Sequence, residues 1–536
     1  MADTEQKARK LRRLPIPRKP VNLARQAFLR VANFGLTAAY NLYRVHPAIW
    51  RFTARNYSPK LEDLARLNAW MICQHAYLDV PAYHDFLAEN DFEFKWWDLS
   101  SYPITAKDTY VARYEEADRC WNGRIRVAGT VVDESSGSTG KPYNWMRSKR
   151  ELHTVHKNMA GFTTMTFGTG EIFCINAFSM GAWATGTNTG LAMAKTAMVK
   201  NTGPDLEKIL DTMEHFGPRF PYLITAYPPF LKHLVDRMDQ EPGRWARFEI
   251  NAFVGGEAMT EGLREYLEKR LGFVYSGYGA SDLTIGMAGE TDLSVVIRKG
   301  LSDPELRVAL LGEDESRTPM IFQYNPLETY LETIEDDNLV VTINNAAVMS
   351  PRLRYNIGDE ARLLSFPEMM ELLRPFPKVA AKAKKAFRAQ RMRLPFLLLF
   401  GRSDATVSYM GANIYPLDVE NGLYGSEKYA PLIDTFRTEL VEIGELEQRP
   451  TIHVQLREAS RLPPGGFGDA EREEMSRQLQ EGVVAHLRTV SRDFLSSVEE
   501  DPSAADIRVE IHDFGAGPFA GDQNKIKNTY LMKGQR

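Results

Sequence analysis

The sequence predicts an α/β fold with a large N-terminal domain of mostly parallel sheets and a small, mobile α+β C-terminal domain. Three observations lead to this prediction. The chain has 536 residues, more than one hydrophobic core usually organises. Between residues 130 and 360, short apolar runs alternate with helical patterns, which is typical of strands covered by helices. After residue 402 the pattern starts again on a smaller scale.

The alternating region supplies strands and helices in turn. We expect buried strands and intervening helices as follows: strands at 172–175, 222–224 and 252–254, and helices at 206–216, 229–238 and 260–271. In the C-terminal part we expect a helix at 469–487 and strands at 451–456 and 507–511. The predicted domains are a basic arm and helix (1–59), an N-terminal domain with a helical start at 60–125 (60–401), and a C-terminal lid (402–536).

The N-terminus is strongly basic. Residues 7–30 carry Lys and Arg side chains and no acidic residue. The overlapping segment 27–50 is apolar, but Arg30 and Arg44 interrupt it, so it does not read as a membrane span of about 20 apolar residues. A basic arm before an amphipathic helix predicts weak contact with an anionic membrane surface, the alternative being a solvated tail and a packed helix.

Bulk composition excludes some function classes. The net charge of -4 gives no reason to expect a nucleic-acid partner. The three cysteines lie far apart, without zinc or redox spacing, which favours a reducing cytoplasmic location. A second basic stretch, 366–395, predicts a solvated helix face or a docking patch for an acidic partner.

The most informative segment is 134–142, which reads Glu-Ser-Ser-Gly-Ser-Thr-Gly-Lys-Pro. Glycines let the backbone approach an anion, hydroxyls donate hydrogen bonds, and Lys141 adds a compact charge. It is not a Walker A loop, because Ser135 stands where that motif has glycine and Pro142 follows the lysine. The segment predicts a polyphosphate-binding loop, with a plain surface loop as the alternative.

Further segments follow this loop in a fixed order: 254–257, 277–282, 354–359, 401–404 with 411–416, and a late lysine at position 525. The series resembles the adenylate-forming superfamily of acyl-CoA synthetases, adenylation domains and luciferases. Residues 74–83 and 102–108 narrow the resemblance to the phenylacetate–CoA ligase branch, with its capsule-biosynthesis-type and deazaflavin-adenylylating relatives. The resemblance covers roughly residues 60–535.

The resemblance implies an ATP site. The phosphate-gripping loop would comprise Ser136, Gly137, Ser138, Thr139 and Gly140, with Lys141 acting on the departing pyrophosphate. The adenine, ribose, α-phosphate and metal would be held by later residues: Gly256 and Glu257 beside the adenine, Tyr278 stacked on it, Gly279 in the same turn, Ser281 at the α-phosphate, Asp282 on Mg²⁺, and Asp359 and Arg402 at the ribose. In the family a glutamate usually holds the metal, and Asp282 is one methylene shorter.

The resemblance also implies a catalytic lysine near the C-terminus and a hinge. Lys525 would bridge the carboxylate and the α-phosphate during adenylation, and Lys527 is a close competitor for this role. Asp404 would be the hinge residue about which the lid turns between the two half-reactions. A second aspartate usually follows this hinge, but Ala405 stands there. These departures favour adenylation over a firm assignment of the second half-reaction.

The implied reaction uses ATP and Mg²⁺ to activate a carboxylic acid as an acyl-adenylate, which then passes to CoA or a carrier protein. Apolar candidates for the acid pocket are Trp183, Tyr227, Phe230 and Ile285. They favour an aryl or aliphatic acid over an amino acid. The alternatives are transfer to an amine, adenylylation without thioester formation, and a non-catalytic scaffold. A homodimer is left open.

Overall fold

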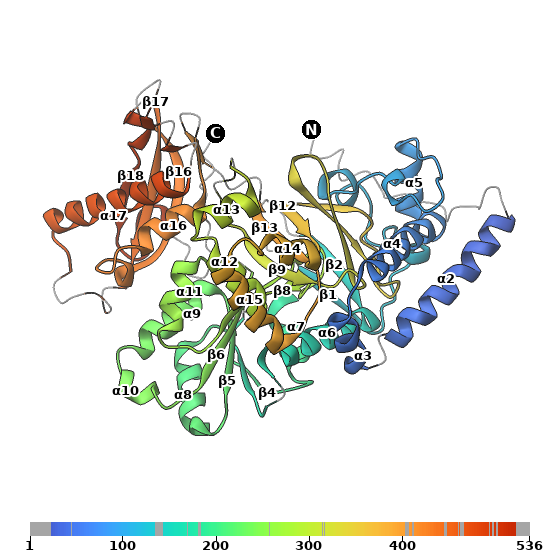
Figure 1. Cartoon of the computed structure of the whole chain (residues 1–536), viewed down its shortest axis with the longest axis horizontal. Helices are drawn as coiled ribbons and strands as arrows, with labels where there is room; N and C mark the ends of the chain where they lie inside the picture. The colour runs from blue at the N-terminus through green and yellow to red at the C-terminus, as the bar shows by residue number, and fades with distance from the viewer. Residues whose placement is uncertain are drawn as a thin grey trace, which may run out of the picture.

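The computed structural model describes most of the chain. The described residues are 23–43, 46–134, 143–168, 170–178, 180, 184–256, 258–313, 315, 317–402, 407–409, 412–443, 447–458, 460, 462, 466–491, 494–495, 498–499 and 502–520. Figure 1 shows an elongated molecule with the N-terminal helix α2 at one end and the C-terminal helix α17 at the other.

One large sheet organises the N-terminal part. Its eleven strands run in the order β10-β11-β12-β13-β9-β8-β7-β6-β5-β3-β4. The bounds are β3 (Phe173–Asn176), β4 (Met198–Asn201), β5 (Tyr222–Ala226), β6 (Ile250–Gly255), β7 (Val274–Tyr278), β8 (Ala288–Gly289), β9 (Met320–Tyr324), β10 (Thr329–Thr333), β11 (Asn338–Ile343), β12 (Tyr355–Leu364) and β13 (Phe396–Arg402). The α/β class predicted from the sequence is confirmed.

The half of the sheet from β4 to β7 is parallel, as predicted. Its helices are α6 (Lys149–Phe167), α7 (Ala184–Met193), α8 (Leu206–Phe216), α9 (Pro228–Met238), α10 (Pro242–Trp245) and α11 (Glu261–Glu268). Every residue of β3 and β5 is buried, which is the pattern of a strand covered on both faces. Helices α8, α9 and α11 pack their apolar stripes onto these strands in a common core.

The other half, from β7 to β10, is antiparallel, so the expectation of a mostly parallel sheet holds for one half and is wrong for the other. Antiparallel neighbours need no helical crossover. Strands β10 and β11, for example, are joined by the short turn at Glu335–Asp337. Helices α12 (Asp292–Gly300) and α13 (Pro304–Leu311) pack over part of this half.

The basic stretch 366–395 forms helices α14 (Phe366–Leu372) and α15 (Pro377–Gln390) between β12 and β13. Helix α15 packs against α12 and buries Ala383 and Ala386. Its lysines Lys382, Lys384 and Lys385 are exposed. The helix is therefore amphipathic, and its basic face meets solvent rather than the sheet.

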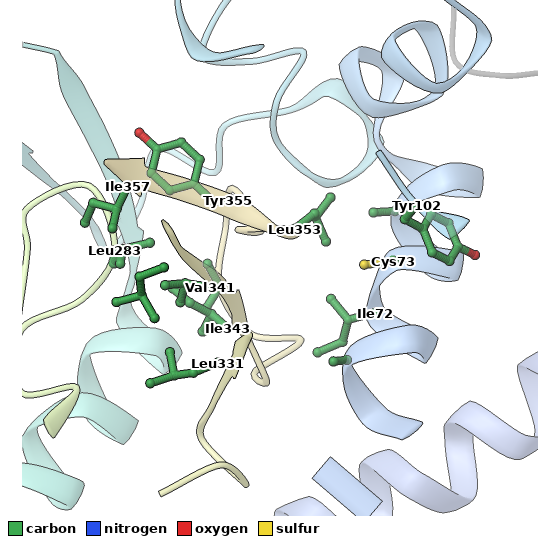
Figure 2. Close-up of a cluster of buried hydrophobic side chains, with 14 of the residues drawn as sticks. Ile72, Cys73, Tyr102, Leu283, Leu331, Val341, Ile343, Leu353, Tyr355 and Ile357 are labelled. Atoms are coloured by element: carbon green, nitrogen blue, oxygen red, sulfur yellow. The ribbon is translucent and has the colours of Figure 1, made fainter. Parts of the chain in front are cut away.

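The N-terminal region is helical, as predicted, with α2 (Leu23–Tyr43), α3 (Pro47–Arg55), α4 (Pro59–Asp79) and α5 (Pro81–Glu89), followed by short helical turns at Leu99–Ser101, Lys107–Val111 and Trp121–Gly123. Helix α4 inserts Ile72 and Cys73 into the core that lies over β10, β11 and β12. Figure 2 shows Val341 and Ile343 of β11 between these side chains and Leu283. No helix among the described residues combines the length and apolar character needed to cross a bilayer.

The C-terminal part has its own core. It contains β14 (Val407–Tyr409), β15 (Ala412–Ile414), α16 (Pro416–Tyr424), β16 (Ile433–Ile443), β17 (Glu447–Leu456), α17 (Asp469–Val490) and β18 (Arg508–His512), with short helical turns at Ala430–Leu432, Pro502–Ala505 and Gly517–Phe519. One face of the sheet β16-β17-β18 packs against α16 and α17. Side chains from these strands and helices form one apolar core. The exact domain boundaries stay a prediction.

A buried ion-pair network joins the two parts. Asp236 of α9 accepts from Arg457, which follows β17, and from Lys232 at 3.3 Å. Lys232 also donates to the backbone carbonyl of Ile433 in β16 at 3.4 Å. Both ends of the network are almost fully buried, so it is part of the packing between the parts rather than a surface contact.

Candidate functional site

The candidate site lies at the edge where the parallel strands end. In such sheets the carboxyl ends of neighbouring strands face a common crevice. Strands β5, β6 and β7 end at Ala226, Gly255 and Tyr278, and the residues predicted for the acid pocket and the adenine wall follow directly. Gly256, just past β6, has a φ of 84°, a conformation that favours glycine.

Tyr278 and Asp359 meet at this edge. The Tyr278 hydroxyl donates to Asp359 Oδ2 at 2.5 Å, and both residues are buried. The Tyr278 ring also lies near-parallel to that of Phe322, with centroids 6.0 Å apart. The two residues predicted to contact adenine and ribose are thus brought into contact, although β8, β9 and β13 lie between their strands in the sheet.

Asp282 is held to the same strand, β12. The Tyr355 hydroxyl donates to Asp282 Oδ2 at 2.9 Å. Burial and the negative charge of Asp282 raise the pKa of Tyr355, which therefore stays a protonated donor. Tyr355 and Asp359 both lie on β12, and both are buried. One strand consequently gives a phenol to Asp282 and a carboxylate to Tyr278.

The turn that carries Ser281 and Asp282 is fixed in place. Leu283 is fully buried in the core beside β11 and β12 (Figure 2). A Cβ on Gly279 would lie 2.8 Å from the Gly286 nitrogen and 2.9 Å from the Thr284 carbonyl oxygen, so glycine is required for the turn to close. Gly279 is thereby explained by backbone packing.

A buried arginine of β2 (Asn144–Ser148) binds the backbone of this turn. Arg147 donates to the carbonyl oxygens of Ser281 at 2.5 Å and Leu283 at 2.6 Å. Its remaining charge is balanced by Asp133 at 3.1 Å and Glu151 at 3.0 Å. Burial raises the pKa of Asp133, and the neighbouring Arg147 opposes that rise.

Arg147 also connects the turn to the predicted phosphate loop. Strands β1 (Thr130–Glu134) and β2 (Asn144–Ser148) form a hairpin that pairs Glu134 with Asn144, the residues on either side of segment 135–143. Asp133 of β1 and Arg147 of β2 are therefore an ion pair at the base of that loop. The loop base and the Ser281–Asp282 turn share one guanidinium.

A second arginine binds the same turn. Arg352 donates from Nε to the Asp282 carbonyl oxygen at 2.7 Å and lies over the ring of Trp145 at 4.5 Å. Arg119 lies near the same ring, 5.7 Å from its centroid. Three almost fully buried arginines thus gather beside the turn predicted to meet the α-phosphate. Sequence reasoning missed all three, because nothing in the pattern distinguishes a buried arginine from a surface one.

The structure describes three of the four residues predicted for the acid pocket. Tyr227 is buried at the start of α9, and its ring lies edge-on to that of Phe178 with centroids 5.1 Å apart. Phe230 and Ile285 are half-buried. Phe178, which follows β3, is an apolar neighbour that the sequence analysis did not name.

Several predicted site residues lie outside the described residues: Ser136, Gly137, Ser138, Thr139, Gly140, Lys141, Trp183, Glu257, Asp404, Lys525 and Lys527. Arg402 is on β13, where its backbone pairs with Asp359 of β12. Ser281 is half-buried next to Asp282. Of the described members, Tyr278 ends β7, Gly256 follows β6, Asp282 lies in the turn after β7, and Asp359 lies within β12.

Comparisons with known proteins agree with this geometry. No protein-family model matches the sequence. The chain is 22% identical over 432 residues to a phenylacetate–coenzyme A ligase of Aromatoleum evansii, a match covering 79% of this chain and 87% of that protein.

Solved structures show the same fold. A 2-hydroxyisobutyryl-CoA ligase in the postadenylation state, in complex with R3-HIB-AMP, matches with a TM-score of 0.61 and 14% identity over 89% of this chain and 90% of that one. The same ligase with 2-HIB-AMP and CoA in the thioesterification state matches with a TM-score of 0.51, 14% identity and the same coverage of both chains. The resemblance stated from the sequence is confirmed as a similarity: the chain is similar to a phenylacetate–coenzyme A ligase over most of its length and has the fold of a solved acyl-CoA ligase.

Proposed function

We propose that this enzyme is an AMP-forming acid–CoA ligase. In the first step a carboxylate oxygen of the acid attacks the α-phosphorus of ATP, the acyl-adenylate forms and pyrophosphate leaves. In the second step the sulfur of CoA attacks the acyl carbon, AMP leaves and the thiol proton is released. The observation that supports this proposal best is the hydrogen bond between Tyr278 and Asp359, in a chain that is similar to a phenylacetate–CoA ligase and has the fold of a solved acyl-CoA ligase.

The site chemistry suits this reaction. Both the attacking carboxylate and the triphosphate are anionic, so cationic groups must reduce their repulsion. Lys141 and Lys525 are the proposed sources of positive charge. The acid is already ionised near neutral pH, so no general base is needed to activate it.

Magnesium is part of the proposal. Asp282 is half-buried at the edge of the turn and supplies a hard carboxylate oxygen, the ligand type that Mg²⁺ prefers. Tyr355 bonds to Oδ2, which leaves Oδ1 as the oxygen that would meet the ion. Mg²⁺ bound there would neutralise phosphate charge next to Ser281.

The site roles of the other predicted residues are likewise proposals. Ser136 to Gly140 would grip the β- and γ-phosphates, Gly256 and Glu257 would line the adenine, and Arg402 would meet the ribose. Tyr227, Phe230, Ile285 and Trp183 would form an apolar acid pocket, which favours an aryl or aliphatic acid. Asp404 would serve as the hinge.

A pyrophosphate-release assay over a panel of carboxylic acids, with and without CoA, tests the function. We expect release that depends on the acid and a thioester product in the CoA arm. Parallel arms with a carrier protein and with amines cover the other acceptors. Release that does not depend on any acid would contradict the proposal, and acid-dependent release without thioester would favour the amine or adenylate-only reactions.

Two lysine variants sharpen the assay. Lys525→Ala should nearly abolish pyrophosphate exchange while thiolysis of a supplied acyl-adenylate largely persists. Lys527→Ala is the matched control two residues away. If Lys527→Ala is the variant that loses exchange, the roles of the two lysines are reversed.

Weak contact with a membrane surface is also proposed, through α2 and the basic segment before it. Helix α2 exposes Phe28, Val31, Phe34 and Leu42, which are 55%, 72%, 77% and 66% exposed. Their spacing places Phe28, Val31 and Leu42 on one stripe, and the helix contains no acidic residue. An apolar stripe next to basic residues is the composition of a helix that lies at a lipid surface. A cytoplasmic location and a homodimer stay predictions.

A further inference from the structure

Among the described residues, three side chains that could hold a metal ion lie together in the C-terminal sheet, outside the candidate site. They are His453 on β17 and Glu510 and His512 on β18. Strands β17 and β18 pair in parallel with His453 opposite Glu510, and His512 stands two residues further along the same face. The strand register therefore brings the three side chains together without any contribution from a loop.

One atom from each of the three side chains lies at a distance from the other two that suits ligands of one metal ion. His453 Nδ1 lies 3.0 Å from His512 Nε2 and 3.4 Å from Glu510 Oε2, and His512 Nε2 lies 3.8 Å from the same oxygen. Atoms bound to one tetrahedral Zn²⁺ at 2.0–2.2 Å lie about 3.3–3.5 Å apart. The mean spacing of this triangle falls in that range.

The outer nitrogen of His453 is also arranged as in a metal site. Nε2 lies 2.8 Å from Glu439 Oε1, on β16. A carboxylate can only accept, so the proton of this ring is on Nε2 and the Nδ1 lone pair points to His512 and Glu510. A carboxylate behind a ligating histidine orients the ring and increases its basicity.

His512 is held in place from its other side. Gly517 has a φ of 56°, and a Cβ there would lie 2.6 Å from His512 Nδ1. The Phe519 ring lies edge-on to the imidazole with centroids 5.9 Å apart. Arg437 fixes this segment by donating to the Pro518 carbonyl oxygen at 2.6 Å. The ring of His512 is thus positioned before any ion arrives.

Access and charge are suitable too. Glu510 and His512 line an open groove with Arg472 and Ser476 of α17, so an ion can enter and a water can complete the coordination. The other carboxylate oxygen of Glu510, Oε1, lies 3.9 Å from a guanidinium nitrogen of Arg508. Glu439 and Glu510 supply two negative charges around the two neutral imidazoles.

We propose that His453, Glu510 and His512 bind a Zn²⁺ ion, with Glu439 as the partner that orients His453. Two histidines, one carboxylate and an open fourth position are a typical zinc donor set. Without metal, His512 Nε2–H donates to His453 Nδ1. Zinc takes the place of that shared proton, and His512 changes tautomer, so that its proton is carried on Nδ1 and both imidazoles stay neutral. The ion joins β17 directly to β18, and Glu439 extends the link to β16.

The test uses the full-length protein, stripped with a chelator, passed through gel filtration and loaded with Zn²⁺ alone. We expect about one retained zinc per chain by mass spectrometry, and with Co²⁺ a visible absorption band of a tetrahedral site. His453→Ala and Glu510→Gln should abolish retention and the band. Glu439→Gln keeps all three ligands and should weaken zinc binding about 10- to 100-fold.

The exposed residues His215 and Glu473 supply controls, and His215→Ala and Glu473→Gln should bind zinc as the unmodified chain does. Glu510 is partly exposed on an edge strand, so Glu510→Gln remains informative if His453→Ala fails to fold. Absence of both retained zinc and the cobalt band would overturn the proposal and leave a hydrogen-bond relay from His512 to Glu439. Unchanged zinc retention in Glu510→Gln would also overturn it. Neither outcome depends on the adenylation activity.

Discussion

Tyr278 and Asp359 share a buried 2.5 Å hydrogen bond, although they are 81 residues apart in the chain. The bond joins the end of β7 to β12. A second bond, from Tyr355 of β12 to Asp282, joins β12 to the turn that follows β7. The carboxylate proposed for the ribose thus accepts from the end of β7, and the carboxylate proposed for magnesium accepts from β12.

Asp359→Asn should lower kcat/KM for ATP by about 10- to 100-fold, because a charged acceptor of hydrogen bonds is lost. Tyr278→Phe keeps the ring and should cost about tenfold or less, mainly in KM. Pyrophosphate exchange at varied ATP measures both. The two effects should be less than additive in the double variant, since the residues contact each other. Full additivity would show that the bond does not matter for ATP binding.

Arg147→Met should destabilise the protein by about 3–5 kcal/mol, because it leaves Asp133 and Glu151 buried without their partner. The matched control is Arg150→Met, three residues later and exposed, which should change stability by less than about 0.5 kcal/mol. Urea unfolding compares the two. Equal stability of both variants would exclude the contacts described for Arg147 at the Ser281–Asp282 turn.

Much of the fold followed from the sequence because its signals are local. The helix expected at 206–216 is α8 with the same bounds, and the apolar runs at 222–224 and 252–254 are parts of β5 and β6. The antiparallel half could not be derived in this way. Strand direction depends on which strands become neighbours, and β13 inserts between β12 and β9 through pairing that no local pattern encodes.

The candidate site was predicted where a motif stands next to a strand end, as for Tyr278 and Asp359. Arg147 and Arg352 were missed because their roles come from burial and from backbone carbonyls far away in the sequence. The zinc cluster left a faint signal. Glu510 and His512 are two residues apart on β18 and therefore share a face, but only the register with β17 adds His453 to the set.

Asp418 predicts a pH dependence of stability. Burial raises the pKa of this carboxyl to about 7, above its ordinary value of 3.8, although Arg307 opposes the rise. The folded state therefore holds a proton that the unfolded state releases, and stability falls as the pH rises from about 4 to about 7. Asp418→Asn stays neutral and should be more stable than the unmodified chain by about 4 kcal/mol at pH 8, with little difference at pH 4.

Thermal melts at both pH values check this prediction. The exposed Asp211 supplies the control, and Asp211→Asn should show no such divergence. If the Asp418→Asn difference is the same at pH 4 and pH 8, the carboxyl is not protonated in the folded state near neutrality.

The α2 stripe predicts binding to anionic vesicles. Val31→Ser combined with Leu42→Ser should reduce co-sedimentation at low salt about tenfold, because two exposed apolar side chains of the stripe no longer enter the lipid surface. Phe52→Ser on α3 removes a side chain that is also exposed, at 67%, and should leave binding unchanged. No co-sedimentation of the unmodified chain at low salt would exclude the membrane contact.

The hold of Arg437 on Pro518 and Phe519 sets a limit on the C-terminal lysine. Ala520 follows this anchored turn, and Lys525 stands five residues later. Five residues span at most about 18 Å even when fully extended. The proposed role of Lys525 therefore requires Ala520 to lie within that length, plus the reach of one lysine side chain, of the candidate site.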